Sequence, residues 1–253
     1  VALPADRQGE VFHRYILGVY DLYERLTSEF PEVLFESCSS GGGRFDPGML
    51  YYAPQGWTSD DSDAIERLKI QYGTSLCYPI SSMGSHVSVI PNHQVFRKTP
   101  LHTRANVAYF GTFGYELDLN SLKEEEIAEV KEQIIFMKKY RKLFQFGDFY
   151  RLKSPFEGNE TIWMVVSEDK KTAIVGYYRT LNGVNQAYSR IKLQGLDPDM
   201  FYENILNKTE NYGDELMNFG LITTDVTAGE VPGDATPCTD FESRIYILKA
   251  KEK

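Results

Sequence analysis

The 253-residue chain has few cysteines, no long apolar run and no excess of positive charge. No window approaches the roughly 18 consecutive apolar residues that a transmembrane helix needs, so we expect no membrane partner. Lys and Arg number 27 against 36 Asp and Glu, which gives a formal net charge of −9. This balance argues against a nucleic-acid partner, because phosphate binding needs clustered basic side chains. It fits a protein that acts on a neutral or cationic small substrate.

The three cysteines, Cys38, Cys77 and Cys238, are odd in number and widely spaced. This pattern favours a reducing compartment over a disulfide framework. The first residues show no basic region followed by an apolar run, so they predict no signal peptide. We therefore expect a cytoplasmic location. The chain also lacks an initiator Met, which suggests processing or a fragment of a longer protein.

Familiar motifs for metal, phosphate and acyl chemistry are also missing. The four histidines, at positions 13, 86, 93 and 102, are not spaced as a metal cluster. The glycine-rich segment Cys38–Gly43 lacks the Lys-Ser/Thr of a phosphate-binding loop, and no Gly-x-Ser-x-Gly elbow is present. We expect no metal and no cofactor. His86 and His93 are interpreted as loop residues, and Trp163 as part of a core.

Residues 1–147 alternate helical patterns with short strand-like runs. Apolar residues at steps of three or four predict helices over Asp6–Phe30 and Ser62–Tyr72, and a third helix follows a capping box at Ser121–Glu124. Strands are predicted over Val33–Phe35, Thr74–Tyr78 and Val107–Phe113. Such alternation indicates parallel strands with crossover helices, as in a (β/α)8 barrel whose active site lies at the strand carboxyl ends. Only three or four of eight units are present, so we expect part of a barrel to be missing.

Residues 148–253 follow a different pattern. Ile162–Ser167 and Thr172–Tyr178 predict a hairpin, and Arg190–Leu193 and Arg244–Lys249 predict further strands. A turn is expected at Val231–Asp234. The predicted fold is therefore α/β plus all-β: half of a barrel over residues 1–147 and an antiparallel β-sandwich domain over residues 148–253.

The segment Cys38–Gly43 follows the first predicted strand. Its glycines would let the backbone approach a ligand closely, because glycine has no side chain and tolerates positive φ. A tight turn with Cys38 as a small buried core residue explains the same pattern. Both interpretations stay open on the residues alone.

Three acids, Asp60, Asp61 and Asp63, precede the second predicted helix. N-capping and compensation of the helix dipole would account for one or two of them. Three acids within four residues repel one another, so at least one carboxyl should have a raised pKa or a fixed partner, as a general acid requires. Trp57 could shield such a group or stack on a sugar. Calcium binding is a rival, but the loop glycine and distal Glu of an EF-hand are absent.

A long stretch of sequence resembles a known family. It reads Cys-x-x-Gly-Gly-Gly-Arg-Phe-Asp-x-Gly-Met-Leu-Tyr-Tyr from Cys38, and then Trp-Thr-Ser-Asp-x-Ser-Asp-Ala-Ile-Glu-Arg-Leu-Lys from Trp57. This looks like the α-galactosidases of glycoside hydrolase family 36. The similarity continues through Thr103–Asn106 and Phe110–Glu116. It covers residues 4–146 well and the remainder more loosely.

The resemblance implies a retaining hydrolase that releases terminal α-linked galactose from oligosaccharides such as melibiose and raffinose. In this family the Asp of Trp-x-Ser-Asp is the acid/base, which falls on Asp60. Cys38 and Gly41 match positions that line the galactose pocket, with Trp57 beside them. Asp63 and Arg67 would be further substrate-binding or supporting residues, since they follow in the same motif. Family members commonly form homo-oligomers, which we expect of the intact protein here.

The second carboxylate of the reaction is not found. In the family, the nucleophile is the Asp of a Lys-Trp-Asp-like strand end, and this chain has no such motif. Asp46 and Asp118 are the nearest spare acids by context, and neither fits. By this resemblance we expect the C-terminal portion of an α-galactosidase, the second half of a (β/α)8 barrel followed by an antiparallel β-sandwich domain, which should not hydrolyse substrate unaided. Galactosyl transfer by the same machinery, or a carbohydrate-binding or oligomerisation module without turnover, are the alternatives.

Overall fold

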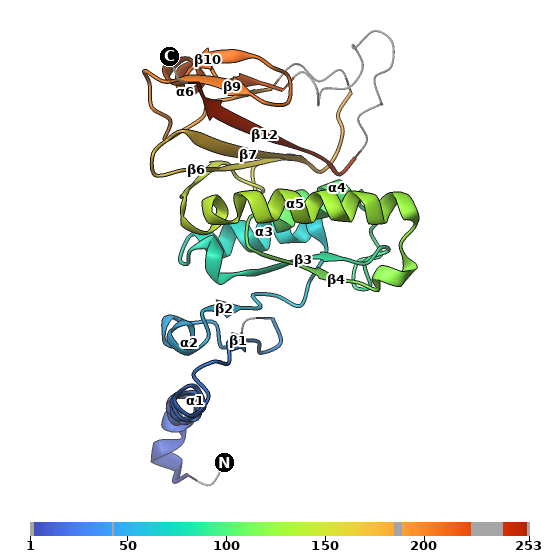
Figure 1. The fold of residues 1–253 in the computed structure, drawn as a ribbon. Helices are drawn as coiled ribbons and strands as arrows, with labels where there is room; N and C mark the ends of the chain where they lie inside the picture. Colours follow the sequence, from blue (N-terminus) through green and yellow to red (C-terminus); the bar gives the residue numbers. More distant parts are fainter. Residues whose placement is uncertain (1–2, 42, 185–188, 224–239, 252–253) are drawn as a thin grey trace. The chain divides into compact units, whose positions relative to one another are not determined.

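The computed structural model describes residues 3–41, 43–184, 189–223 and 240–251, and these form two compact units, residues 1–60 and 61–253 (Figure 1). Cys238 and the turn expected at Val231–Asp234 lie outside the described residues. None of the helices in the described part of the chain is both long and apolar enough to cross a membrane.

The first unit is built from one long helix and two very short parallel strands. Its elements are η1 (Ala5–Glu10), α1 (Val11–Glu29), β1 (Glu36–Ser37), α2 (Pro47–Tyr52) and β2 (Gln55–Gly56). The helix predicted over Asp6–Phe30 is confirmed by η1 and α1. Its apolar stripe faces the rest of the unit: the ring of Tyr23 lies 5.8 Å from that of Phe35 and 6.3 Å from that of Tyr52.

The strand predicted over Val33–Phe35 is wrong. The Val33 and Leu34 side chains are 50% and 89% exposed, and the strand is formed by the next two residues, Glu36 and Ser37. An apolar run of three residues is too short to separate a buried strand from an exposed connection. The pairing of β1 with β2 is parallel, as expected, with Ser37 opposite Gly56.

The second unit begins with two further strand–helix repeats. The elements are α3 (Ala64–Ser75), η2 (Ile80–Ser82), β3 (Gly84–Ser88), α4 (Leu101–Ala108), β4 (Thr112–Glu116), η3 (Leu119–Ser121) and α5 (Glu124–Phe146). β3 and β4 pair in parallel, with Ser85 opposite Phe113. In Figure 1 the helices lie between this strand pair and the large sheet that follows. The predicted alternation of helices with parallel strands is therefore present, although several boundaries differ.

Two predicted strands fall elsewhere. Thr74 and Ser75 end helix α3, and the N–H groups of Cys77 and Tyr78 both donate to the Thr74 carbonyl in a turn. The strand is instead β3, whose sequence Gly-Ser-His-Val-Ser has one apolar residue and so gave no strand signal. His86 consequently lies within β3 and not in a loop.

The strand predicted over Val107–Phe113 is only half right. Val107 and Ala108 end helix α4, and β4 begins at Thr112. Both helix and strand can contain a short buried apolar run, which explains the shift. The capping box expected at Ser121 is also wrong, because the Ser121 hydroxyl donates to the Asp118 carbonyl. Helix α5 begins at Glu124, and its N-cap is Lys123, whose N–H donates to the Glu126 carboxylate.

The rest of the second unit is an antiparallel sheet with the order β10-β9-β12-β7-β6-β5. Its strands are β5 (Asp148–Lys153), β6 (Glu160–Val166), β7 (Thr172–Arg179), β9 (Phe201–Asn204), β10 (Glu210–Tyr212) and β12 (Glu242–Ala250). A small pair, β8 (Arg190–Ile191) with β11 (Leu221–Ile222), and helix α6 (Gly213–Asn218) accompany it. The hairpin predicted from the sequence is confirmed as β6–β7, and the last predicted strand is β12.

The central strands β6 and β7 of the large sheet are buried on both faces. Trp163 and Val165 of β6 belong to a core shared with helices α3, α4 and α5, whereas their neighbours Ile162 and Met164 belong to a second core on the other face. This alternation follows from the two-residue period of a strand. The prediction that Trp163 is a core residue is confirmed, since its side chain is 1% exposed.

Candidate active site

The two segments that the sequence singles out leave the ends of neighbouring strands. Cys38 follows β1, and Trp57 follows β2. The pairing continues one step beyond the strands, because the Trp57 N–H donates to the Ser37 carbonyl at 2.8 Å. Since β1 and β2 are parallel, both segments begin at the same edge of the pair. In barrels of this type, catalytic residues come from the carboxyl ends of the strands.

The glycine-rich turn after β1 closes tightly against the segment after β2. Ser40 and Gly41 have φ of +47° and +72°, and the Gly43 N–H donates to the Ser39 carbonyl at 2.9 Å. A Cβ on Gly41 would lie 2.7 Å from the backbone nitrogen of Asp60 and 2.9 Å from Cα of Ser59. Only a residue without a side chain fits between these backbones.

The predicted residues of the first unit differ in exposure. Cys38 and Asp60 are exposed, Gly41 is partly buried, and the Trp57 side chain is buried at 9% exposure. The interpretation of Cys38 as a buried core residue is therefore wrong. Among the described residues, the Asp60 carboxylate has no hydrogen-bond or ion-pair partner. A carboxyl group in such a position can meet a ligand.

Arg44, which sequence reasoning missed, connects the turn to helix α1. Its guanidinium donates to the Tyr15 hydroxyl at 2.7 Å and to the Cys38 carbonyl at 3.0 Å. Asp46 then caps helix α2 by accepting the Met49 N–H at 2.9 Å, and it also accepts a hydrogen bond from the Tyr20 hydroxyl at 2.7 Å. The only signal in the sequence was the Arg-Phe-Asp that directly follows the glycines.

Asp63, in the second unit, is the N-cap of helix α3. Its carboxylate accepts the N–H groups of Ile65 and Glu66, both at 3.0 Å, and forms an ion pair with Arg97. The side chain is 1% exposed. Asp61 in turn accepts the Asp63 N–H at 3.0 Å. Of the three acids, Asp63 is therefore the one with the expected fixed partners, while the Asp60 carboxylate is exposed.

Arg67 lies one turn into α3 and is also buried, at 2% exposure. Its guanidinium donates to the Gly84 carbonyl at the start of β3 and to the Gln71 side chain at 3.4 Å. Burial lowers the pKa of Arg67 to about 10, against the opposing effect of the negative charges of Asp61 and Glu116. Within the second unit, Arg67 therefore joins helix α3 to strand β3.

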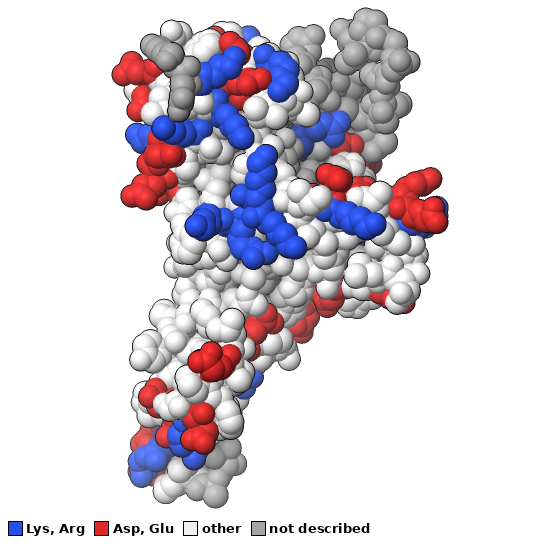
Figure 2. Space-filling model, viewed as in Figure 1, with Lys and Arg blue, Asp and Glu red and all other residues white. Residues whose placement is uncertain are grey.

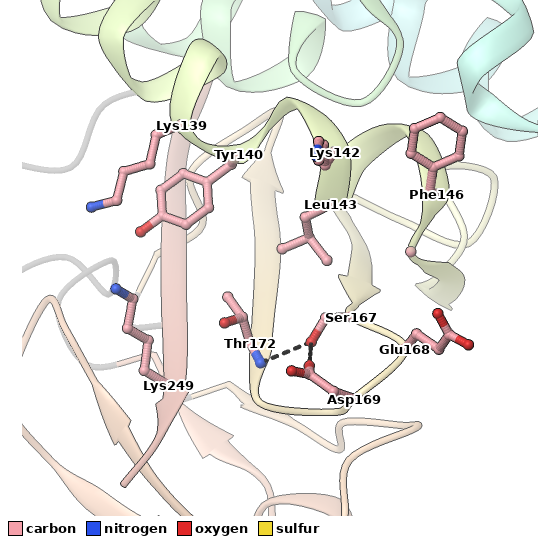
Figure 3. Close-up of a pocket in the computed structure, with 11 residues that line it drawn as sticks. Lys139, Tyr140, Lys142, Leu143, Phe146, Ser167, Glu168, Asp169, Thr172 and Lys249 are labelled. Atoms are coloured by element: carbon pink, nitrogen blue, oxygen red, sulfur yellow. Dashed lines mark hydrogen bonds between the residues drawn. The ribbon is translucent and has the colours of Figure 1, made fainter.

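A separate cavity of about 430 Å³ lies between the C-terminal half of α5, the β6–β7 turn and β12 (Figure 3). Lys139 and Lys249 extend their amino groups toward the same space beside Tyr140, and positive charge gathers on this face of the molecule (Figure 2). Helix α5 runs to Phe146 and its last turn has no basic residue, so Lys139 lies short of the negative pole of the helix. None of the predicted site residues lines this cavity. In the described ranges, no group of three or more His, Cys, Asp and Glu is arranged to hold a metal ion.

Comparison with known families agrees with the geometry. The model described as Melibiase matches residues 1–147, and the model for the glycosyl hydrolase family 36 C-terminal domain matches residues 160–248. The chain belongs to glycosyl hydrolase family 36. The resemblance noted in the sequence is thereby confirmed.

Among the family 36 relatives is the α-galactosidase AgaA of Geobacillus stearothermophilus, which is 58% identical over 254 residues. The match covers 100% of this chain and 33% of AgaA, so the chain spans about a third of the length of the curated relatives it matches. Crystal structures of AgaA variants with 1-deoxygalactonojirimycin and with raffinose each superpose with a TM-score of 0.89 and 52% identity, over 99% of this chain and 33% of theirs. These structures confirm the predicted fold class, part of a barrel followed by an antiparallel β-domain.

Proposed function

We propose that the chain supplies the acid/base carboxylate and part of the galactose pocket of a retaining α-galactosidase. The observation that carries the proposal is the packing of Gly41 against the Ser59–Asp60 backbone, at the carboxyl ends of parallel strands. This packing brings the turn with the exposed Cys38 next to the segment with the exposed Asp60. Raffinose, bound in a crystal structure of a relative, represents the proposed substrate class of terminal α-galactosides.

In the proposed mechanism Asp60 acts twice. It first gives its proton to the oxygen of the glycosidic bond while a second carboxylate attacks the anomeric carbon of galactose. It then takes a proton from the water that hydrolyses the covalent intermediate. Cys38, Gly41 and Trp57 would form the wall beside the sugar. Asp63 and Arg67 are proposed to support the site, because their own contacts hold the start of α3 and its connection to β3.

The second carboxylate is not assigned within this chain. The Lys-Trp-Asp-like motif is absent, and Asp46 is occupied as the cap of α2. A retaining reaction needs two carboxyl groups about 5–5.5 Å apart. We infer that residues 1–147 form part of the catalytic barrel and residues 148–253 the β-domain, and that this chain by itself does not turn over substrate. A cytoplasmic location and a homo-oligomer of the intact protein belong to the same proposal.

Hydrolysis of two α-galactosides tests these roles. Release of p-nitrophenol from the aryl α-galactoside and of galactose from melibiose should be measured for this chain and for any longer product of the gene. Each should also be tested with Asp60→Asn. We expect the longer product to lose activity on melibiose by at least about 10²-fold, because a sugar leaving group needs the proton. The loss on the aryl substrate should be smaller, since nitrophenol leaves without protonation.

Four outcomes would count against the proposal. Turnover by the 253-residue chain would contradict the missing nucleophile. Full melibiose activity of Asp60→Asn would contradict the acid/base role. Products that carry galactose on a second sugar, in place of free galactose, would favour the galactosyl transferase, and binding of melibiose without turnover by the longer product would favour a carbohydrate-binding module.

A further inference from the structure

Arg44 forms a bridge within the first unit between helix α1 and the glycine-rich turn. One nitrogen of its guanidinium donates to the hydroxyl of Tyr15 on α1, at 2.7 Å, and another donates to the backbone carbonyl of Cys38, at 3.0 Å. The guanidinium is planar and rigid, so two acceptors held by one fork are fixed in direction as well as distance. The bridge thus sets where the first residue of the turn lies relative to α1.

The conformation of the turn is strained at its centre. Ser40 is a non-glycine residue with φ of +47°, in a region that L-residues adopt at a cost of the order of 1 kcal/mol. Cys38 is exposed, and the Gly43 N–H bond to Ser39 closes the turn only on itself. Gly41 is held from outside by the Ser59–Asp60 backbone, and Arg44 supplies the hydrogen bond from outside the turn that holds the Cys38 end.

We propose that Arg44 is a positioning residue for the galactose-pocket wall formed by Cys38 and Gly41. The inference rests on the proposed function, because it assumes that this wall faces the sugar. Arg44 acts through the Cys38 carbonyl and is not expected to touch the substrate. Losing it should loosen the turn and weaken sugar binding, while helix α1 and the strand pair β1–β2 remain.

Two measurements on the 253-residue chain test the proposal, in a background with Cys77→Ser and Cys238→Ser that leaves Cys38 as the single thiol. The first is hydrogen exchange of the backbone amides over residues 38–43. The second is the concentration of 1-deoxygalactonojirimycin that halves the rate of Cys38 alkylation. Each variant is compared with itself without the ligand, so a changed thiol reactivity cancels.

For Arg44→Ala we expect faster exchange across the turn and a half-protecting concentration about tenfold higher, the effect of losing one hydrogen bond to a charged donor. Arg44→Lys keeps the charge but loses the forked guanidinium, so its exchange rate and half-protecting concentration should fall between those of the parent and of Arg44→Ala. Arg25→Ala is the matched control: Arg25 is also in the first unit, and its ion pair is with Asp21 of the same helix. Circular dichroism of each variant verifies that the helices are retained.

The outcomes separate the inference from the proposed function. Unchanged exchange in Arg44→Ala overturns the inference, and so does faster exchange with an unchanged half-protecting concentration, because the role would then be structural only. Absence of any protection in the parent chain counts against the galactose pocket. In that case the exchange measurement alone still decides whether Arg44 positions the turn.

Discussion

The backbone of Gly41 lies directly against the backbone of Asp60: a Cβ on Gly41 would be 2.7 Å from the Asp60 nitrogen. Real Cβ atoms do not approach backbone atoms this closely, and backbone on both sides leaves no flexible side chain to move away. The φ of Gly41, +72°, also favours glycine over any other residue. The two residues are 19 positions apart, and their contact joins the turn after β1 to the segment after β2.

Gly41→Ala should therefore destabilise the first unit and separate the two segments. We expect a loss of about 2–3 kcal/mol in the free energy of unfolding, from the positive φ and the close contact together. Urea unfolding followed by circular dichroism measures it. Gly18→Ala is the control, because a Cβ there meets nothing within 4 Å and alanine in helix α1 should stabilise by up to about 1 kcal/mol. Equal stability of Gly41→Ala and the parent would contradict the prediction.

The sequence predicted the long elements because their signals are local. Helix α1 has apolar residues at the spacing of a helix, and the β6–β7 hairpin consists of two continuous apolar runs on either side of the polar turn at residues 168–171. Strand β3 was missed because it is buried through small polar residues such as Ser85 and Ser88, which carry no hydrophobic signal. Where the burial of a strand comes from neighbours distant in sequence, a single-sequence pattern cannot show it.

The candidate site was predicted from its family motif more than from the charges and helix-capping pattern of its residues. The motif pointed to Asp60, but the capping argument applied equally to Asp60, Asp61 and Asp63, and only the structure shows that Asp63 is the N-cap. Arg44 escaped notice because its two acceptors, Tyr15 and Cys38, are 29 and 6 residues away. No local pattern records such contacts.

Mutation of Asp63 should lower the stability of the fold, whereas mutation of Asp60 should leave it nearly unchanged. Asp63→Ala removes the cap of α3 and one of the two carboxylates that pair with Arg97, which keeps its ion pair with Glu66, so we expect a loss of about 2–3 kcal/mol in the free energy of unfolding. Asp60→Asn should change it by less than about 0.5 kcal/mol, because the side chain is exposed. Urea unfolding of both variants measures this. A marked loss of stability in Asp60→Asn would indicate a structural role for that residue.

Tyr178 links the large sheet to helix α4. Its hydroxyl donates to the Asn106 carbonyl at 2.6 Å and accepts the Trp163 indole N–H at 2.9 Å, and the side chain is 1% exposed. Tyr178→Phe leaves two buried polar groups unpaired, so we expect a loss of about 2–3 kcal/mol. Tyr212→Phe, at a partly exposed tyrosine, should cost less. Thermal unfolding followed by tryptophan fluorescence measures the difference, and a loss of stability in Tyr178→Phe below that in Tyr212→Phe would contradict the role.

The contacts of Glu242 should make the fold less stable at acid pH. Its carboxylate, at the start of β12, interacts with His102 of α4 at 2.8 Å and with Arg244 of its own strand. Burial alone would raise the pKa of Glu242, but the hydrogen bond with His102 and the charge of Arg244 outweigh burial and lower the pKa to about 2. A carboxyl whose pKa is lower in the folded than in the unfolded chain stabilises the fold once it is ionised in both states.

That stabilisation is fully present above about pH 4.5 and is lost as the pH falls toward 2. We expect it to contribute about 1–2 kcal/mol at pH 7, allowing for solvent screening. Urea unfolding at pH 7 and pH 3 should show a smaller difference for Glu242→Gln than for the parent. Glu168→Gln, at an exposed acid on the β6–β7 turn, controls for the loss of one charge. If the difference in unfolding free energy between pH 7 and pH 3 were the same for Glu242→Gln as for the parent, the contacts of Glu242 with His102 and Arg244 would not stabilise the packing of α4 against β12.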